Sequence, residues 1–403
     1  MRPVIDFIYI DSGGGHRAAA TALMEVIRRE QRPWDLRMLS IQDLLNSIDV
    51  IRKSTGIQFQ EIYNIMLRRG WTLGTEQIIP VMHAMIRFFH RDEVRVLAQH
   101  WNTAPPDMVV SMIPHYNRAI REALDQVTSA AGWPGATPLV TILTDIADHP
   151  PHFWIERQDQ YVICGSERAE QQARAIGLPP SRIRRVSGMI LNPRFYELPP
   201  VDRAAERVRL GLRPDLPTGL VLFGGEGSME MVRIARSIDK SSVETQLILL
   251  CGRHQEAARE LRSMGRRIPV FVEGFTREIP YYMALADYFI GKPGPGCLSE
   301  ALAMHLPAIV ERNAWTLAHE RYNADWLLEQ GAGLVIASFS GIAGAVRQLL
   351  SPDEYPRYRR RAAATRNIAV FEIPELLDKI LRQPGEVLSP IKSVTKHAAA
   401  HLQ

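Results

Sequence analysis

The alternation of short apolar segments with helical segments constrains the fold of this chain more than any other feature. The predicted strands are short and rich in branched apolar residues, and they cover residues 4–10, 108–112, 139–143, 161–164, 183–186, 220–223, 246–251, 270–272, 288–290, 308–310 and 334–336. Buried strands that are separated by helices predict parallel sheets. About six strands fall in each half, so we expect an α/β protein built from two Rossmann-like doubly wound domains that face a cleft.

The domain boundary is predicted near residue 198, because Leu198-Pro199-Pro200 and the charged segment 202–209 resemble a linker. We therefore expect an N-terminal domain at 1–197, a C-terminal domain at 198–388, and a disordered tail at 389–403. A length of 403 residues lets each domain bury its own core.

Composition narrows the class of protein further. Hydrophobic residues make up 46% of the chain and charged residues 23%, as in soluble globular proteins. The three cysteines form no metal or disulfide pattern, and no apolar run approaches the ~20 residues of a membrane-spanning helix. The start has no signal-peptide pattern, so a cytoplasmic location is expected. A net charge of +4 permits contact with an anionic surface without requiring it.

The segment 291–301, Gly-Lys-Pro-Gly-Pro-Gly-Cys-Leu-Ser-Glu-Ala, joins a predicted strand to a predicted helix. Its glycines and prolines predict a tight turn that directs backbone N–H groups and the positive end of the helix at one point, which suits a phosphate. Glu300 falls in the first helical turn, where a carboxylate can accept hydrogen bonds from a ribose diol. The alternative is an ordinary strand–turn–helix connection in which Glu300 only offsets the helix dipole.

A second glycine turn follows the first predicted strand, with the sequence Asp-Ser-Gly-Gly-Gly-His-Arg at residues 11–17. It matches neither a dinucleotide-binding fingerprint nor a Walker motif. His16 falls at the start of the next helix, beside the turn. Histidine is useful there because its pKa lies near neutrality, whereas the alternative is a capping or buried structural role.

Residues 49–100 interrupt the alternation. A predicted helix there has one apolar face, which is formed by Ile78, Ile79, Met82, Met85, Ile86 and Phe89. The arginines and the tryptophan near this face are Arg68, Arg69, Trp71, Arg87 and Arg91. An apolar face edged by such residues can bind an anionic lipid surface, although packing against the chain's own domain gives the same periodicity.

Several short motifs occur in a fixed order. They are Ser12-Gly-Gly-Gly-His16-Arg17-Ala18, Asp49-Val50 with Thr55-Gly56, Pro106-Asp107, Thr144-Asp145 with His149-Pro150, Gly224-Gly225-Glu226-Gly227, Cys251-Gly252, Lys292 with Gly294-Pro295-Gly296 and Glu300-Ala301, and His319-Glu320 with Asn323 before Gly331-Ala332-Gly333. In order and spacing they resemble the monogalactosyldiacylglycerol synthase family of family 28 glycosyltransferases. These enzymes are kin of the bacterial cell-wall enzyme that adds N-acetylglucosamine to lipid I.

The resemblance implies a GT-B fold, a UDP-sugar donor in the C-terminal domain, and a lipid acceptor such as diacylglycerol at the N-terminal domain. It also implies inversion of the anomeric centre, by an enzyme that binds peripherally to the inner face of the cell membrane. His16 is the expected general base, with Asp145 as its rival. The residues expected to bind the donor are Gly224, Gly225, Gly227, Phe275, Lys292, Gly294, Pro295, Gly296, Cys297, Glu300, Glu320 and Asn323. Those expected to bind the acceptor or the membrane are Gly14, Gly15, Arg68, Arg69, Trp71, Arg87, Arg91 and His149.

Within the expected donor site, the glycines let backbone approach the diphosphate and Glu300 binds the ribose. Phe275, or the backbone around it, faces the uracil, and Glu320 and Asn323 reach the sugar. No Asp-x-Asp motif occurs in the chain, so we expect no essential metal and no cofactor beyond the UDP-sugar co-substrate. No nucleic acid partner is expected.

Three positions depart from the family pattern: Cys297 replaces a small hydroxyl residue, Ser111-Met-Ile-Pro114 replaces a segment that often carries His-Pro, and His319 replaces glutamine or glutamate. They leave the sugar and the acceptor open. A transferase for another amphiphilic acceptor and a catalytically silent sugar-nucleotide or lipid-binding module remain alternatives. A nucleotide-dependent oxidoreductase fits less well, because its glycine fingerprint is missing from the first half.

Overall fold

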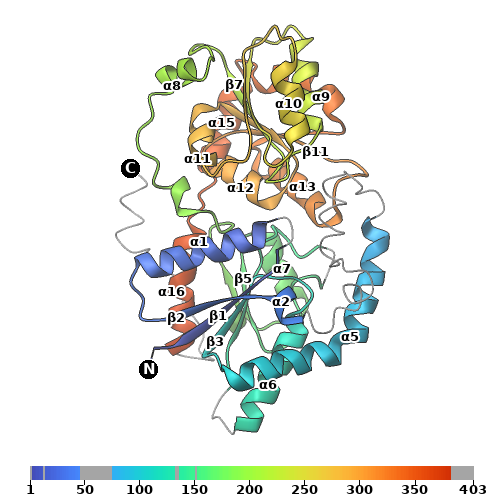
Figure 1. Ribbon diagram of the computed structural model, residues 1–403, viewed down its shortest axis with the longest axis vertical. Coiled ribbons are helices and arrows are strands. Elements are labelled where there is room, and N and C mark those ends of the chain that lie inside the picture. Colours follow the sequence, from blue (N-terminus) through green and yellow to red (C-terminus); the bar gives the residue numbers. More distant parts are fainter. Residues whose placement is uncertain (1, 12–13, 46–74, 132–135, 150–151, 383–403) are drawn as a thin grey trace. The chain divides into compact units, whose positions relative to one another are not determined.

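The computed structural model describes residues 2–11, 14–45, 75–131, 136–149 and 152–382. These residues form two compact units. The first is made of 2–11, 14–45, 75–131, 136–149, 152–193 and 368–382, and the second of 194–367. Each unit contains one parallel six-stranded sheet with flanking helices, which confirms the predicted fold class (Figure 1).

The first unit has the strand order β2-β1-β3-β4-β5-β6. Its strands are β1 (Val4–Tyr9), β2 (Asp35–Ser40), β3 (Met108–Ser111), β4 (Leu139–Ile142), β5 (Tyr161–Cys164) and β6 (Ile183–Arg185). Its helices are α1 (Gly15–Arg29), α2 (Ile41–Leu45), α5 (Thr75–Thr103), α6 (Asn117–Ala131), α7 (Glu167–Ala175) and α16 (Ala369–Arg382).

The second unit has the strand order β12-β11-β10-β7-β8-β9. Its strands are β7 (Thr218–Leu222), β8 (Gln246–Leu250), β9 (Val270–Glu273), β10 (Tyr288–Gly291), β11 (Ala308–Glu311) and β12 (Gly333–Ile336). Its helices are α8 (Arg203–Arg209), α9 (Glu230–Asp239), α10 (Gln255–Ser263), α11 (Ile279–Leu285), α12 (Pro295–Ala303), α13 (Arg321–Gln330), α14 (Ile342–Leu349) and α15 (Tyr355–Ala364).

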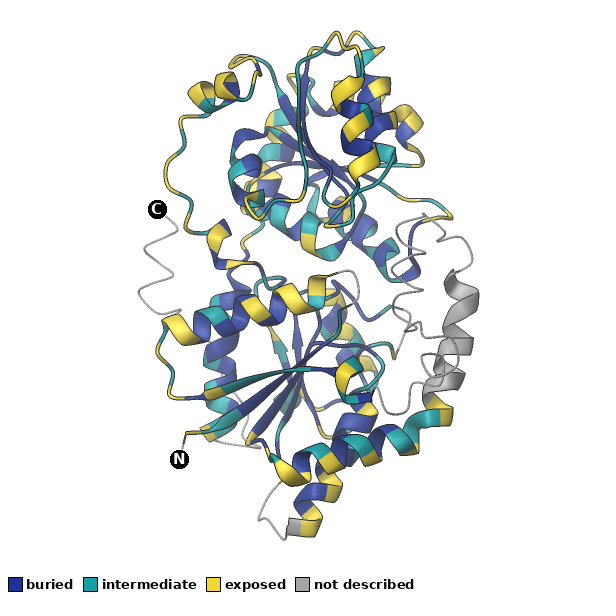
Figure 2. Ribbon diagram, viewed as in Figure 1, coloured by how far each residue is buried: buried dark blue, intermediate teal, exposed yellow. Residues whose placement is uncertain are grey.

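Burial explains why the central strands are nearly continuous runs of apolar residues. Every residue of β3, β4, β5, β7, β8 and β10 is buried, because helices cover both faces of a parallel sheet. Figure 2 shows these strands as the buried centre of each unit, whereas the helices expose one side. Each unit therefore forms its own hydrophobic core.

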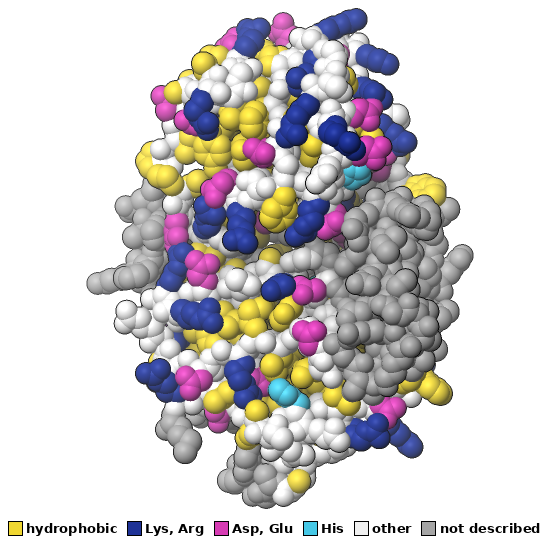
Figure 3. All heavy atoms as spheres, in the orientation of Figure 1, with side chains coloured by type: hydrophobic (Ala, Val, Ile, Leu, Met, Phe, Trp, Pro, Cys, Tyr) yellow, Lys and Arg dark blue, Asp and Glu magenta, His cyan; other side chains and the backbone are white. Residues whose placement is uncertain are grey.

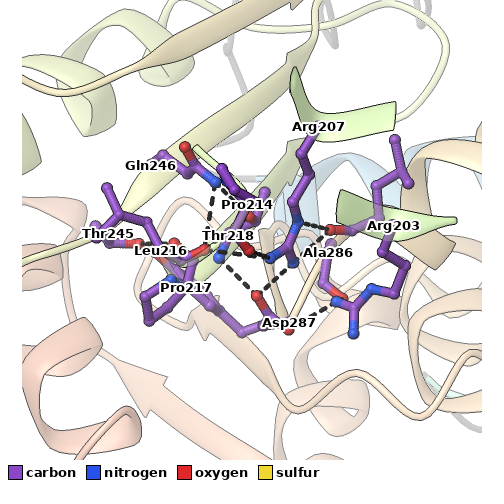
Figure 4. A network of polar contacts seen from close by, with 12 residues as sticks. Arg203, Arg207, Pro214, Leu216, Pro217, Thr218, Thr245, Gln246, Ala286 and Asp287 are labelled. Atoms are coloured by element: carbon purple, nitrogen blue, oxygen red, sulfur yellow. Dashed lines mark hydrogen bonds and ion pairs between the residues drawn. The ribbon is translucent and has the colours of Figure 1, made fainter. Parts of the chain in front are cut away.

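The charged segment predicted to be a linker folds instead as helix α8. Asp202 caps this helix by accepting hydrogen bonds from the N–H groups of Ala204 and Ala205, both at 3.1 Å. Arg207 extends from α8 into the unit and donates to Asp287 Oδ2 at 2.7 Å, while Arg203 donates to Asp287 Oδ1 at 2.7 Å (Figure 4). The carboxylate also accepts the N–H of Thr218 at 2.8 Å. This ion-pair network joins α8 to the amino ends of β7 and β10.

Helix α16 corrects the predicted domain boundary at the other end of the chain. The C-terminal domain was expected to extend to residue 388, but the second unit ends at Asn367. Helix α16 packs on α1 instead, and its Ile373, Leu377 and Ile380 are buried in the core that contains Leu23. Arg32 strengthens this packing by donating to Glu375. The tail at 389–403 lies outside the described residues.

Part of the predicted membrane segment also falls outside the described residues, including Arg68, Arg69 and Trp71. The backbone of α5 is described throughout, and its side chains are described from Arg87 onward. Among the described residues, no helix has both the length and the apolar character needed to cross a membrane. Basic and acidic side chains are interspersed over the described part of the face in Figure 3, in keeping with the small net charge.

Candidate functional site

The second unit gathers most of the predicted donor residues at one edge of its sheet. Strands β7 and β10 are paired, and from them the sheet extends in opposite directions, to β8 and to β11. The loops that leave their carboxyl ends contain Gly224-Gly225-Glu226-Gly227 and Lys292-Pro293-Gly294. Open α/β sheets bind ligands at such a topological switch point, because the two loops diverge and leave a crevice.

The glycine turn after β7 packs directly on the turn after β8. Gly227 has φ of 71°, and a Cβ there would lie 2.1 Å from the carbonyl oxygen of Cys251. Gly252 has φ of 57°, and its Cβ would lie 2.3 Å from the carbonyl oxygen of Gly225. The Arg253 N–H donates to this same oxygen at 2.9 Å. Both positions require glycine, since any side chain would force the two turns apart.

The start of α12 follows the turn after β10. Gly294 is its N-cap and gives no side-chain cap, and Pro295 occupies the first helical position. The first intrahelical bond runs from Leu298 N to Gly294 O at 3.1 Å, so the N–H groups of Gly296 and Cys297 precede the helical ladder. These two donors and the helix dipole make an anion-binding end. Burial raises the pKa of the Cys297 thiol to about 12, so it remains protonated at neutral pH.

Glu300 is half-buried one turn into α12. Its carboxylate makes no hydrogen bond to any described residue, and burial raises its pKa to about 7. A carboxylate in this state costs folding free energy unless a ligand supplies hydrogen-bond donors. The structure therefore leaves an acceptor beside the anion-binding end of the helix.

Lys292, Glu320 and Asn323 meet around the turn after β10. Lys292 Nζ donates to Glu320 Oε1 at 3.0 Å, and the Glu320 carboxylate is almost completely buried. Asn323 is fully buried, and its Nδ2 donates to the carbonyl oxygen of Pro293 at 2.8 Å. Its Oδ1 has no partner among the described residues. Asn323 thus holds the turn in place, a contact that sequence reasoning did not predict.

Phe275 lies after β9 and is 53% exposed. The guanidinium carbon of Arg253 lies 4.6 Å from the centre of its ring, and Arg253 Nη1 donates to Glu226 at 3.0 Å. The three residues follow three neighbouring strands, β9, β8 and β7. Arg253 and Glu226 were not predicted as site residues, although both are adjacent to predicted glycines.

The first unit brings the predicted acceptor residues to the carboxyl ends of β1 and β4. His16 Nδ1 lies 2.8 Å from the hydroxyl oxygen of Thr144, and its ring centre is 5.7 Å from that of Trp154. Asp145 is buried, and its Oδ2 accepts a hydrogen bond from Trp154 Nε1 at 2.8 Å. Trp154, which was not predicted as a site residue, therefore contacts both predicted catalytic residues.

The remaining predicted residues of this unit are placed as follows. Gly14 has φ of 79° and caps the start of α1, Gly15 begins that helix, His149 is half-buried on the loop after β4, and Arg87 and Arg91 are exposed on α5. Among the described residues, no three His, Cys, Asp or Glu side chains are grouped so that they could hold a metal ion. The expectation that no metal or cofactor is needed stays a prediction.

Comparison with known proteins supports a sugar-transferring enzyme. Residues 220–371 match the model of the glycosyltransferase family 28 C-terminal domain. The chain is 28% identical over 395 residues to a probable monogalactosyldiacylglycerol synthase 2 of Oryza sativa subsp. japonica, with 94% of this chain and 80% of the relative covered. It is 28% identical over 396 residues to the monogalactosyldiacylglycerol synthase of Spinacia oleracea, with 93% and 72% covered.

Solved structures agree on the fold. MurG of Acinetobacter baumannii superposes with a TM-score of 0.58 at 14% identity, covering 94% of this chain and all of MurG. HepE of Anabaena, in complex with UDP-glucose, gives 0.53 at 15% identity, covering 94% of this chain and all of HepE. At such low identity these structures show the fold and not the reaction.

The comparisons contradict the expected cytoplasmic location at the inner face of the cell membrane, because the relatives are named as chloroplastic enzymes in rice, spinach and Arabidopsis. Cysteine usage, on which part of that expectation rested, reports redox conditions and not a compartment. The predicted resemblance itself is confirmed. The chain has the GT-B fold, its residues 220–371 match the C-terminal domain of family 28 glycosyltransferases, and over most of its length it resembles monogalactosyldiacylglycerol synthases.

Proposed function

We propose that the protein transfers a hexose from a UDP-sugar to diacylglycerol or a related lipid, with inversion, so that an α-linked donor yields a β-glycolipid. The acceptor oxygen forms a bond to the anomeric carbon while the bond from that carbon to the diphosphate breaks. The hydroxyl proton passes to a base of the first unit, and UDP leaves from the second.

The observation that carries the donor half is the Glu300 carboxylate beside the N-terminal end of α12, which has no hydrogen-bond partner in the described part of the chain. A nucleoside diphosphate suits this pair of features, because its phosphates accept from the helix N–H groups while its ribose hydroxyls donate to Glu300. The exposed Phe275 ring, with Arg253 against it, offers a surface for the uracil. Lys292 adds a positive charge for the leaving diphosphate.

Support for the lipid acceptor comes from the relatives, which are named for a synthase of monogalactosyldiacylglycerol. The chemistry of transfer then requires a base near the acceptor hydroxyl. His16 suits this role in the tautomer that donates Nδ1–H to Thr144 Oγ1, because the lone pair of the imidazole then lies on Nε2. Asp145 is the rival base.

A donor and acceptor screen tests the reaction. Purified protein is incubated with a panel of UDP-sugars and diacylglycerol in anionic vesicles, and the product is analysed by mass spectrometry and by NMR of its anomeric proton. We expect one glycosylated lipid with a β linkage. UDP binding without any product in the panel would favour a silent binding module. A product formed only on another amphiphile would show that the acceptor is not diacylglycerol.

Calorimetry with UDP tests the donor site. Loss of an acceptor for the ribose costs on the order of 1.5–3 kcal/mol, so Glu300→Ala should weaken UDP binding roughly 10- to 100-fold. Glu256→Ala is the control, because Glu256 is an exposed carboxylate at the start of α10. Unchanged UDP affinity in folded Glu300→Ala protein refutes the assignment.

Two variants decide the base. His16→Ala and Asp145→Asn should both retain UDP binding, since both residues belong to the other unit. If His16 is the base, His16→Ala lowers turnover about 10²- to 10⁴-fold. Near-normal turnover of His16→Ala, together with an inactive Asp145→Asn, would make Asp145 the base.

Helix α5 supports binding to an anionic bilayer. Phe88 is 80% exposed on this helix, between the exposed Arg87 and Arg91. An aromatic ring inserts at a lipid interface while each nearby arginine contributes about 1 kcal/mol at an anionic surface. Phe88→Asp should therefore weaken sedimentation with anionic vesicles, and salt should weaken the binding of the unmodified protein. Val208→Asp, at an exposed apolar residue of α8, is the control. Equal binding to neutral and anionic vesicles would refute the proposal.

A further inference from the structure

Asp148 lies at the centre of the loop that follows β4, with its side chain buried. Its carboxylate accepts four backbone N–H groups from residues 152–155. Oδ1 accepts from Trp154 at 2.7 Å and from Phe153 at 2.9 Å, and Oδ2 accepts the other two at 3.2 and 3.4 Å. Gln172 of α7 holds the backbone of Asp148 itself, through bonds of 2.9 Å to its N–H and 2.7 Å to its carbonyl oxygen. One side chain therefore fixes four consecutive residues.

Trp154 is held from both sides. Its N–H donates to Asp148, and its carbonyl oxygen accepts from Asn117 Nδ2 at 2.9 Å. Asn117 is itself fixed by Ser111 at the end of β3, whose hydroxyl donates to Asn117 Oδ1 at 2.6 Å. The indole is fully buried and has one polar atom, Nε1. Fixing the backbone in this way fixes the direction in which that N–H points.

The indole N–H is directed at Asp145 Oδ2, at 2.8 Å. This is the single hydrogen bond that the Asp145 side chain makes within the described residues, so Oδ1 keeps its capacity to accept. An indole N–H cannot accept a proton or rotate independently of its ring, which makes it a rigid donor. The arrangement fixes the position of Oδ2 and leaves Oδ1 for an incoming hydroxyl.

We propose that Asp148 is a positioning residue for Asp145 and that it acts through the backbone and indole of Trp154. The proposal rests on the proposed role of Asp145 at the acceptor site, whether as base or as the group that binds the acceptor hydroxyl. Asp148 does not touch substrate. The four hydrogen bonds of Asp148 keep the indole N–H of Trp154 directed at Asp145. Active sites use preorganised donors of this kind to hold a reacting group in one geometry.

A double-mutant cycle separates this role from a structural one. Asp148→Asn replaces one acceptor oxygen by an NH₂ group, so two of the four N–H groups lose their partner. Trp154→Phe keeps an aromatic ring but removes the indole N–H. Each single variant should lower kcat about 10-fold without changing KM for the UDP-sugar or Kd for UDP. The double variant should also lose about 10-fold, because both changes break the same chain of contacts. Asp159→Asn is the control, because Asp159 forms a surface ion pair with Arg182, and this variant should retain full activity.

An additive loss of about 100-fold in the double variant would overturn the proposal, because independent structural damage adds. So would a normal kcat for Asp148→Asn or Trp154→Phe. If Asp148→Asn fails to fold, Gln172→Leu replaces it in the cycle, since it removes the contacts that hold the Asp148 backbone and leaves the carboxylate intact. It should show the same non-additivity with a smaller loss.

A second readout needs no activity. In protein labelled with ¹⁵N-tryptophan, seven indole N–H signals are expected, and the one missing from Trp154→Phe belongs to Trp154. In Asp148→Asn this signal should move toward the position of an indole without a hydrogen bond. An unmoved signal refutes the positioning role even in an active enzyme. A moved signal in a protein with no transferase activity refutes the proposed function and leaves the Asp148 contact chain intact.

Discussion

Glu300 should destabilise the folded protein at alkaline pH. Its pKa is about 7 in the native state against an ordinary value of 4.5, because burial disfavours the charged carboxylate. Below pH 4.5 the group is neutral in both states and costs nothing. As the pH rises to 7 the unfolded chain releases the proton first, so stability falls, and above 7 the full cost remains. At 1.4 kcal/mol per pH unit, this pKa difference can lower the free energy of unfolding by at most about 3 kcal/mol. Since the side chain is only half-buried, we expect about 1–3 kcal/mol.

Glu300→Gln tests this reasoning, because the amide stays neutral at every pH. In urea denaturation at pH 8, the variant should be more stable than the unmodified protein by about 1–3 kcal/mol in the transition that UDP shifts. At pH 4.5 the two should be equal. UDP should nevertheless bind the variant about 10-fold more weakly, because the ribose loses a charged acceptor. A stability difference that does not change with pH, or a less stable variant at pH 8, would refute the argument.

Three further changes have defined outcomes. Asp287→Asn should lower the free energy of unfolding by about 3 kcal/mol in urea denaturation, because it leaves the buried Arg207 without a counterion. Gly227→Ala should abolish UDP binding in calorimetry or unfold the second unit, because its Cβ would lie 2.1 Å from the Cys251 carbonyl oxygen. Thr144→Val should lower turnover about 10-fold with unchanged UDP affinity, because His16 Nδ1 loses its hydroxyl partner.

Much of the fold could be predicted from the sequence, because a strand buried on both faces must be apolar throughout. Strands β3 and β8 are examples. Strand β2 was not predicted, because it is a half-exposed edge strand and so has no apolar run. Its Arg37 pairs with Asp6 of β1. The charges of α8 suggested a linker, since nothing local shows that Arg207 is directed into the second unit.

The candidate site was predictable where function requires glycine or a helix start. Lys292, Gly294 and Glu300 lie together because a strand, a turn and a helix follow one another in the chain. The contacts that shape the first unit's site join residues distant in sequence, such as Thr144 and His16. The role of Asp148 could not be predicted, because it depends on the backbone of residues 152–155 returning to donate to its carboxylate. No local sequence pattern indicates this contact.

The packing of α16 on α1 has a consequence for the order in which the protein can form during synthesis. Among the described residues, the second unit occupies the stretch 194–367, so it can fold as soon as that stretch has left the ribosome. The first unit cannot complete its core at that stage, because Ile373, Leu377 and Ile380 have yet to leave the ribosome. The β-sheet that was translated first must therefore wait, with the apolar side of α1 uncovered, until the end of translation supplies its last helix.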